Sequence, residues 1–352
     1  MPAGVSSIRV STPRLDTHVL THGAPGGVPV VFVHGNVSSG RFFAELMASL
    51  PPSIQAFAPD LRGFGQSELR PVDATRGVRD FADDVGALLD ALNIGTSERP
   101  AHVVGWSVGG CIALQLAMDR GAGIASLILE APMSPFGFGG TKGADGTACF
   151  EDWAGTGGGT ANPDFVSRLN AKDASADADT SPRNIMRSFY VKPGFSFPDG
   201  LEDAYVQAML QTVVAPGNYP GDAGTSANWP TIAPGPQGVN NAISGQYCDL
   251  SGFADIGPRP PVLWIRGADD QIVSDTSLFD LGFLGQLGAV PGWPGADVFP
   301  PQPMVGQTRA VLERYAAAGG TVREEVLPDC GHSPHIEKQG AFRELLLGAV
   351  SG

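Results

Sequence analysis

The chain has 352 residues, 42% of them hydrophobic, and a formal net charge of −14. It is long enough for one large domain, or for such a domain with an insertion. Its acidity, without any cluster of lysine and arginine, argues against nucleic acid and anionic membranes as partners. The 48 glycines and 30 prolines predict many turns and long loops.

The sequence carries no signal for export, membrane insertion or metal binding. No apolar run is long enough for a membrane span, and the N-terminus lacks a basic start and a hydrophobic stretch. We therefore expect a cytoplasmic protein. The four cysteines form no Cys-x-x-Cys motif, so we expect no metal. Cys149 and Cys248 could pair, but free thiols are the expectation without an export signal.

Apolar runs and helical periodicity alternate along the first third of the chain. Residues 8–22 alternate in polarity and predict two short antiparallel strands. The following segments predict a parallel sheet with helical crossovers. Buried strands are expected at 28–33, 54–58, 102–104 and 126–130, and helices at 41–50, 78–92 and 111–117.

This alternation stops near residue 131 and returns near residue 261. Residues 137–160 are glycine-rich and are interpreted as either a lid hinge or disordered surface. Later segments predict helices at 181–190, 201–213, 304–318 and 341–350, strands at 261–267 and 321–327, and a loop insertion at 274–303. The fold class predicted is α/β, a doubly wound, mostly parallel sheet. Its parts are a core half at 1–132, a cap or lid at 133–257, and a second core half at 258–352.

The segment Gly105-Trp106-Ser107-Val108-Gly109 lies between a predicted strand and a predicted helix. A Gly-x-Ser-x-Gly sequence in this context is typical of a nucleophile elbow, where a sharp turn exposes the serine at a helix N-terminus. Glycines at both ends let the strand and helix approach closely. The sequence therefore identifies Ser107 as a candidate nucleophile.

Four further motifs follow predicted strands. They are His34-Gly35-Asn36, the segment Asp60-Leu61-Arg62-Gly63-Phe64-Gly65-Gln66-Ser67, and the pair formed by Arg266-Gly267-Ala268-Asp269-Asp270 and Gly331-His332-Ser333-Pro334-His335-Ile336-Glu337. Together with the elbow, and in this order, they resemble the α/β-hydrolase superfamily, in its serine-nucleophile esterase or lactonase branch with a cap insertion.

The resemblance implies a role for each motif. The backbone N–H groups of Asn36 and Val108 would form the oxyanion hole. His332 would be the general base and Asp270 the acid that orients it, with Glu130 as the alternative acid. The Asp60 segment would be structural, with Asp60 and Arg62 pairing or capping.

A Ser107–Asp270–His332 triad predicts a hydrolase that cleaves carboxylic esters or lactones of small, largely apolar molecules through an acyl-enzyme. Carbon–carbon bond hydrolysis and haloperoxidase-like perhydrolysis are alternatives on the same triad, and a non-catalytic binder is a third. Trp106 and His34 are predicted to border the substrate pocket. The expected partner is a small-molecule ester or lactone, with no cofactor, no nucleic acid and no membrane, and the chain is expected to be a monomer or homodimer.

Overall fold

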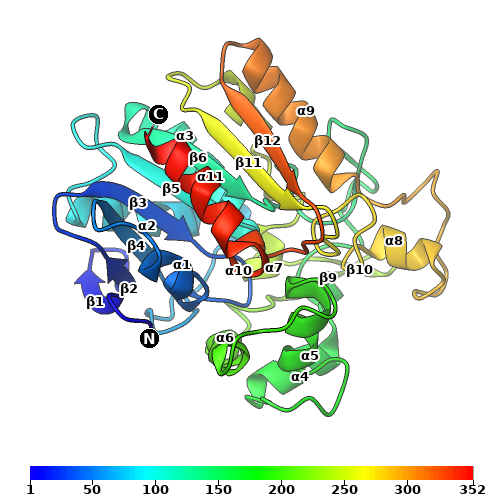
Figure 1. Ribbon diagram of the computed structural model, residues 1–352. Coiled ribbons are helices and arrows are strands. Elements are labelled where there is room, and N and C mark those ends of the chain that lie inside the picture. The colour runs from blue at the N-terminus through cyan, green and yellow to red at the C-terminus, as the bar shows by residue number, and fades with distance from the viewer. Residues whose placement is uncertain (352) are drawn as a thin grey trace.

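An eight-stranded sheet forms the centre of the molecule in a computed structural model that describes residues 1–351 (Figure 1). Gly352, the last residue of the predicted second core half, lies outside the described residues. The strand order is β1-β2-β4-β3-β5-β6-β11-β12. Only the contacts of β2 are antiparallel, so the predicted mostly parallel sheet is confirmed. The strands span Ser6–Ser11, Asp16–His22, Val28–Val33 (β3), Ile54–Pro59 (β4), Ala101–Trp106 (β5), Ile124–Glu130 (β6), Val262–Gly267 (β11) and Val322–Leu327 (β12).

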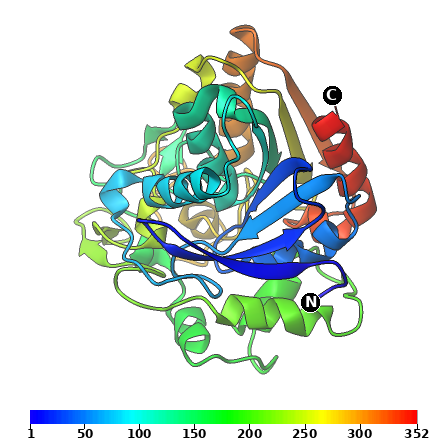
Figure 2. The ribbon, with the colours of Figure 1, turned by 90° about the vertical axis from the view of Figure 1, so that its left-hand side faces the viewer.

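Helices cover both faces of this sheet, as the turned view shows (Figure 2). Side chains alternate between the two faces along each strand, so β3 sends Val31 and Val33 into one core and Val30 and Phe32 into the other. All four are fully buried, which explains the unbroken apolar run in the sequence. The first core contains α2 (Arg79–Ala91), α3 (Val108–Arg120) and α9 (Met304–Ala317), and the second contains α1 (Ala44–Ala48) and α11 (Gln339–Ser351).

The predicted helix at 41–50 is shorter than expected. A 3-10 turn, Gly40–Phe43, leads into α1 and replaces the first turn of that helix. Ser39 caps the turn by accepting a hydrogen bond from the Arg41 N–H. The turn brings Phe42 and Phe43, both buried, under the carboxyl ends of the strands. It therefore supplies part of the wall behind the elbow.

Short helices and two small ribbons occupy the region between β6 and β11. The helices α4, α5 and α6 lie together below the sheet in Figure 1. The predicted helix at 181–190 is α5 followed by a π-helical turn, η5. The elements are β7 (Thr141–Lys142), β8 (Thr147–Ala148), α4 (Pro163–Asn170), α5 (Pro182–Ile185), η5 (Met186–Tyr190), α6 (Leu201–Leu210), β9 (Ala223–Thr225), β10 (Ile232–Pro234) and α7 (Val239–Ala242).

The glycine-rich segment 137–160 is packed, so its interpretation as disordered surface is wrong. Thr141 is completely buried within it. Gln302 accepts a hydrogen bond from the Gly139 N–H at 2.6 Å and donates to the Gly137 carbonyl at 2.9 Å. Gln307 donates to Thr141 Oγ1 at 3.0 Å. These buried amides tie the segment to the second core half.

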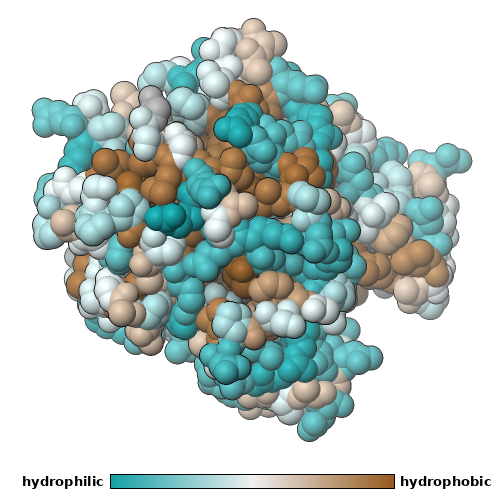
Figure 3. Space-filling model, viewed as in Figure 1, coloured by the Kyte–Doolittle hydropathy of each residue, from teal (hydrophilic) through white to brown (hydrophobic). Residues whose placement is uncertain are grey.

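The loop insertion at 274–303 carries one short helix, α8 (Leu281–Gln286). A hydrophobic patch covers this part of the surface, at the right of Figure 3. The exposed apolar side chains there are Phe279, Leu287 and Val298. No helix within residues 1–351 combines the length and apolarity needed to cross a membrane. The four cysteines are free thiols.

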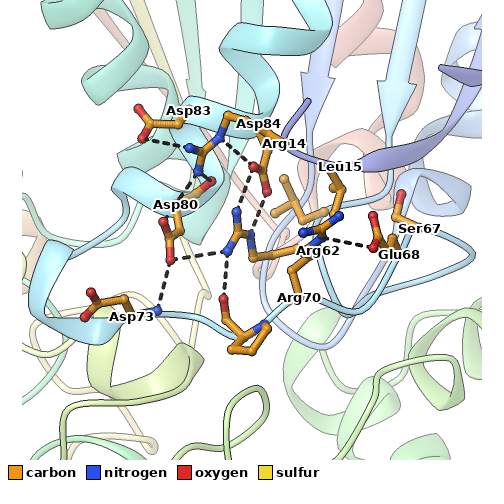
Figure 4. Close-up of polar contacts among 12 residues, drawn as sticks. Arg14, Leu15, Arg62, Ser67, Glu68, Arg70, Asp73, Asp80, Asp83 and Asp84 are labelled. Atoms are coloured by element: carbon orange, nitrogen blue, oxygen red, sulfur yellow. Dashed lines mark hydrogen bonds and ion pairs between the residues drawn. The ribbon is translucent and has the colours of Figure 1, made fainter. Parts of the chain in front are cut away.

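Asp60 and Arg62 do not pair with each other, although both have the structural role expected. Arg62 forms a two-pronged ion pair with Asp84 of α2, at 2.6 and 2.8 Å, within a larger cluster of arginines and aspartates (Figure 4). Asp60 lies 2.8 Å from His18 Nδ1 and accepts the N–H of Gly40. Because Asp60 binds His18 of β2 and Arg62 binds Asp84 of α2, these contacts fix the loop after β4 to both elements.

Candidate active site

Ser107 lies at the turn between β5 and α3 with φ of 57° and ψ of −120°. This left-handed backbone is uncommon for a residue with a side chain and stores strain. Hydrogen bonds on both sides hold it: the Ser107 N–H donates to the Glu130 carbonyl at 2.9 Å, and the Ser107 carbonyl accepts the N–H of Met133 at 3.1 Å. The side chain is thereby presented at the carboxyl edge of the sheet, and the residue is 9% exposed.

Three glycines make this close approach feasible. A β-carbon on Gly105 would lie 2.3 Å from the Gly109 carbonyl oxygen, and one on Gly109 would lie 2.1 Å from the Val33 oxygen. A β-carbon on Gly35 would lie 2.9 Å from that of Ser107. Any larger residue at these positions would push β3, β5 and α3 apart. The Gly-x-Ser-x-Gly pattern therefore has a packing reason here.

His332 and Asp270 form a buried hydrogen-bonded pair near Ser107. His332 Nδ1 lies 2.8 Å from Asp270 Oδ2. The other carboxylate oxygen of Asp270 accepts the N–H groups of Ile272 and Val273, at 2.8 and 3.0 Å. The Trp106 indole donates to the His332 carbonyl at 2.8 Å, which anchors the loop to the elbow strand. The ring of His332 therefore has its Nδ1 fixed and its Nε2 directed away from Asp270.

Glu130, the alternative acid, binds a different histidine. Its Oε1 accepts the backbone N–H of His335 at 2.7 Å and lies 2.8 Å from His335 Nδ1. Both side chains are almost completely buried. The Trp106 ring packs against both imidazoles, with ring centres 5.6 Å from His332 and 5.1 Å from His335. Glu130 thus pairs with His335, while Asp270 pairs with His332.

The loop after β3 holds the Gly35 carbonyl in a buried position. His34 Nε2 accepts the N–H of Leu61 at 2.9 Å, so the proton resides on Nδ1, which donates to the Gly35 oxygen at 2.7 Å. Ser38 Oγ donates to the same oxygen at 2.8 Å. Burial lowers the pKa of His34 to about 4, so the ring is neutral near pH 7. Since the C=O and N–H of one peptide point in opposite directions, the Asn36 N–H faces away from His34.

His34 does not border the pocket, so that prediction is wrong. It is completely buried, and both ring nitrogens are engaged in holding the loop. The sequence motif could not reveal its tautomer or its partners. Ser38, the second residue holding this loop, was missed; a serine three residues after a turn carbonyl is the available signal.

Two backbone N–H groups at the site have no acceptor within the described part of the chain. They belong to Asn36 and to Val108, the first residue of α3. The first N–H groups of any helix lack partners inside the helix and carry its positive dipole end. Both residues border the same cavity as Ser107. The predicted oxyanion-hole positions are thus adjacent to the serine and available to an anion.

A cavity of about 440 Å³ lies over Ser107. His332 and Trp106 also line it, whereas Asp270 and Glu130 do not. Ser107 Oγ and His332 Nε2 form no hydrogen bond within residues 1–351, and such bonds often tighten only when substrate is bound. The wall is mostly apolar. Most of it comes from the region between β6 and β11, called the middle region below, and from the loop insertion at 274–303. Its main apolar residues are Met133, Phe138, Phe165, Ile185, Phe189, Tyr190, Tyr219, Ile243, Ile272, Leu278, Phe279, Leu281 and Leu284.

Comparison with known proteins places the chain in one class, the hydrolases of the alpha/beta fold. The model of the alpha/beta hydrolase family matches residues 30–345. This chain therefore belongs to the alpha/beta hydrolase family. The esterase EaEST from Exiguobacterium antarcticum superimposes with a TM-score of 0.60 at 16% identity, covering 99% of this chain and all of the other. That likeness concerns the fold.

Curated relatives match over a smaller region. Lipase LipV from Mycobacterium tuberculosis is 36% identical over 34% of this chain and 42% of its own length. The 2-hydroxymuconate semialdehyde hydrolase from Pseudomonas sp. strain CF600 is 36% identical over 31% of this chain and 38% of its own. The chain thus spans about two fifths of the length of these relatives. Their named activities differ, so they support a hydrolase without selecting a substrate.

Proposed function

We propose that the protein is a serine hydrolase that cleaves carboxylic esters or lactones of small, largely apolar molecules. The observation that carries this proposal is a single cavity bordered by Ser107, His332, Asn36 and Val108, the last two of which have backbone N–H groups without an acceptor in the described part of the chain. These are the nucleophile, base and oxyanion donors that acyl transfer requires.

In the proposed reaction, Ser107 Oγ bonds to the ester carbonyl carbon while His332 Nε2 takes the hydroxyl proton of Ser107. Asp270 holds the imidazole in the required tautomer and stabilises the imidazolium that forms. The Asn36 and Val108 N–H groups bind the developing alkoxide, and removal of one such donor typically costs about 3 kcal/mol of transition-state stabilisation. His332 then protonates the leaving alcohol. Water attacks the acyl-enzyme by the same steps and releases the acid.

The cavity wall supports the apolar character of the proposed substrate. Side chains of leucine, isoleucine, phenylalanine and tyrosine surround the site on most sides. Within residues 1–351, no lysine or arginine lines the cavity, and Asp179 is the one carboxylate residue that does. A carboxylate or phosphate on the substrate would therefore enter without a cation to pair with.

The proposal is tested by labelling the protein with a fluorophosphonate and mapping the adduct. We expect a single adduct on Ser107, and loss of p-nitrophenyl butyrate hydrolysis in Ser107→Ala with unchanged circular dichroism. An adduct elsewhere, or full activity in Ser107→Ala, would overturn the assignment. The Cys111→Ser variant is a control, because Cys111 is buried on the same helix and does not border the cavity.

A further inference from the structure

Asn36 connects the core to the middle region through hydrogen bonds to two side chains of the middle region, Tyr190 and Asn240. The hydroxyl of Tyr190 donates to the Asn36 carbonyl at 2.9 Å and lies 3.3 Å from the Val37 carbonyl. Asn36 Nδ2 donates to Asn240 Oδ1 at 2.9 Å. Asn36 Oδ1 accepts the N–H of Val37 at 3.0 Å. Apart from its backbone N–H, every polar group of Asn36 therefore has a partner.

We propose that Tyr190 and Asn240 are positioning residues for the oxyanion hole. They hold Asn36 so that its N–H faces the acyl group on Ser107. This inference rests on the proposed function, because it assigns Asn36 the role of oxyanion donor. It adds that the hole, although built on the core, is completed by residues of the predicted cap.

Tyr190 is well placed for this task. It is the last residue of η5, is 7% exposed, and packs its ring 5.8 Å from that of Trp106 and 6.4 Å from that of His332. Burial raises its pKa well above the usual value for tyrosine, so the hydroxyl keeps its proton and remains a donor. Because the tyrosine ring is rigid and buried, its hydroxyl has a fixed position, and the Asn36 carbonyl that accepts its hydrogen bond is held in place.

The loop that Tyr190 binds is strained. Val37 has φ of 45°, in the left-handed region that a β-branched residue rarely adopts, and it is buried. Such a conformation is unfavourable and persists only where neighbouring contacts enforce it. The bonds from Tyr190 to the carbonyls on either side of this strained residue supply that enforcement. Without them, residues 36 and 37 can relax from this conformation. Asn36 then shifts, and with it the N–H that His34 and Ser38 orient through the Gly35 carbonyl.

Asn240 supplies the second attachment from a different element. It lies in α7, where its backbone N–H donates to the Pro220 carbonyl at 2.9 Å. Its side chain borders the cavity beside that of Asn36. Because η5 and α7 approach Asn36 from two separate parts of the middle region, movement of that region would change the oxyanion hole directly.

The experiment compares Tyr190→Phe with Tyr205→Phe. Each removes one hydroxyl from a buried tyrosine of the middle region, but Tyr205 donates to Glu45 at 3.2 Å and does not border the cavity. The measurements are the second-order rate of phosphonylation of Ser107 by a fluorophosphonate, kcat and KM for p-nitrophenyl butyrate, and Tm. The phosphoryl oxygen of the probe occupies the oxyanion hole, so labelling reports on the hole directly.

We expect Tyr190→Phe to lower the labelling rate and kcat about tenfold or more, with KM within threefold of the wild type. Tyr205→Phe should keep both rates within twofold at a similar loss of Tm. Asn240→Ala should follow Tyr190→Phe. If Tyr190→Phe and Tyr205→Phe have equal rates, the inference is wrong while the proposed function stands. If the wild type is not labelled at Ser107, the proposed function itself fails.

Discussion

Glu130 Oε1 binds both the backbone N–H and the imidazole of His335, at 2.7 and 2.8 Å. The carboxyl edge of the sheet thus carries a second carboxylate–histidine pair besides Asp270–His332, and the Trp106 ring packs against the histidines of both pairs. Both pairs are buried, but only His332 borders the cavity. Under the proposed function, the Asp270–His332 pair acts in catalysis, and the Glu130–His335 pair anchors the loop after β12.

Asp270→Asn should therefore mainly reduce activity, and Glu130→Gln should mainly reduce stability. We expect Asp270→Asn to lower kcat on the order of 10⁴-fold, because the amide favours the wrong histidine tautomer. Glu130→Gln should keep kcat within fivefold and lower the free energy of unfolding by about 2 kcal/mol, through loss of a charge-assisted hydrogen bond. Kinetics and urea denaturation on both variants check this. Inactivation by Glu130→Gln alone would make Glu130 the acid.

The elbow glycines give a prediction about packing. Gly109→Ala should lower the free energy of unfolding by about 3 kcal/mol, because its β-carbon would lie 2.1 Å from a backbone oxygen of β3. Gly348→Ala is the matched control, since it also lies in a helix and its β-carbon would meet nothing within 4 Å. That variant should be more stable by about 0.5–1 kcal/mol, as expected for alanine over glycine in a helix. Equal denaturation midpoints for the two would refute the crowding argument.

The neutrality of His34 predicts how stability depends on pH. Its folded-state pKa of about 4 lies below the unfolded value of 6.5. Between these values the unfolded chain binds the proton and the folded protein does not. The stabilisation is therefore complete above pH 6.5 and is lost as the pH falls toward 4 and below.

His34→Gln removes this titration while keeping a polar side chain at the position. We expect the wild type to lose about 3 kcal/mol more than His34→Gln between pH 6.5 and 4. The check is the free energy of unfolding of both proteins by urea at several pH values. Parallel pH profiles would show that folding does not lower the pKa of His34.

The sequence was informative wherever the signal is local. The strand–turn–helix around Ser107 is set by glycines at 105 and 109. Asp270 follows the apolar strand β11, whereas His332 is marked by its own Gly-His-Ser-Pro-His motif, because the strand before it, VREEVL, is mostly polar. The partners of Asn36 could not be predicted, because Tyr190 and Asn240 lie 154 and 204 residues away in a region without regular periodicity. The pairing of Glu130 with His335 also depends on how β6 and the last loop meet in space.

The apolar cavity predicts discrimination by substrate charge. The test pair is p-nitrophenyl butyrate and the half ester p-nitrophenyl hydrogen succinate, which have acyl chains of equal carbon number but differ by one carboxylate. We expect kcat/KM to be about 100-fold lower for the anion, because its carboxylate loses water without gaining a cation. Asp179 at the cavity wall adds repulsion, so Asp179→Asn should raise the rate for the anion two- to threefold and leave the neutral ester unchanged. Turnover of both esters at similar rates would mean that the acyl chain reaches solvent, and the cavity would then not select the acyl group.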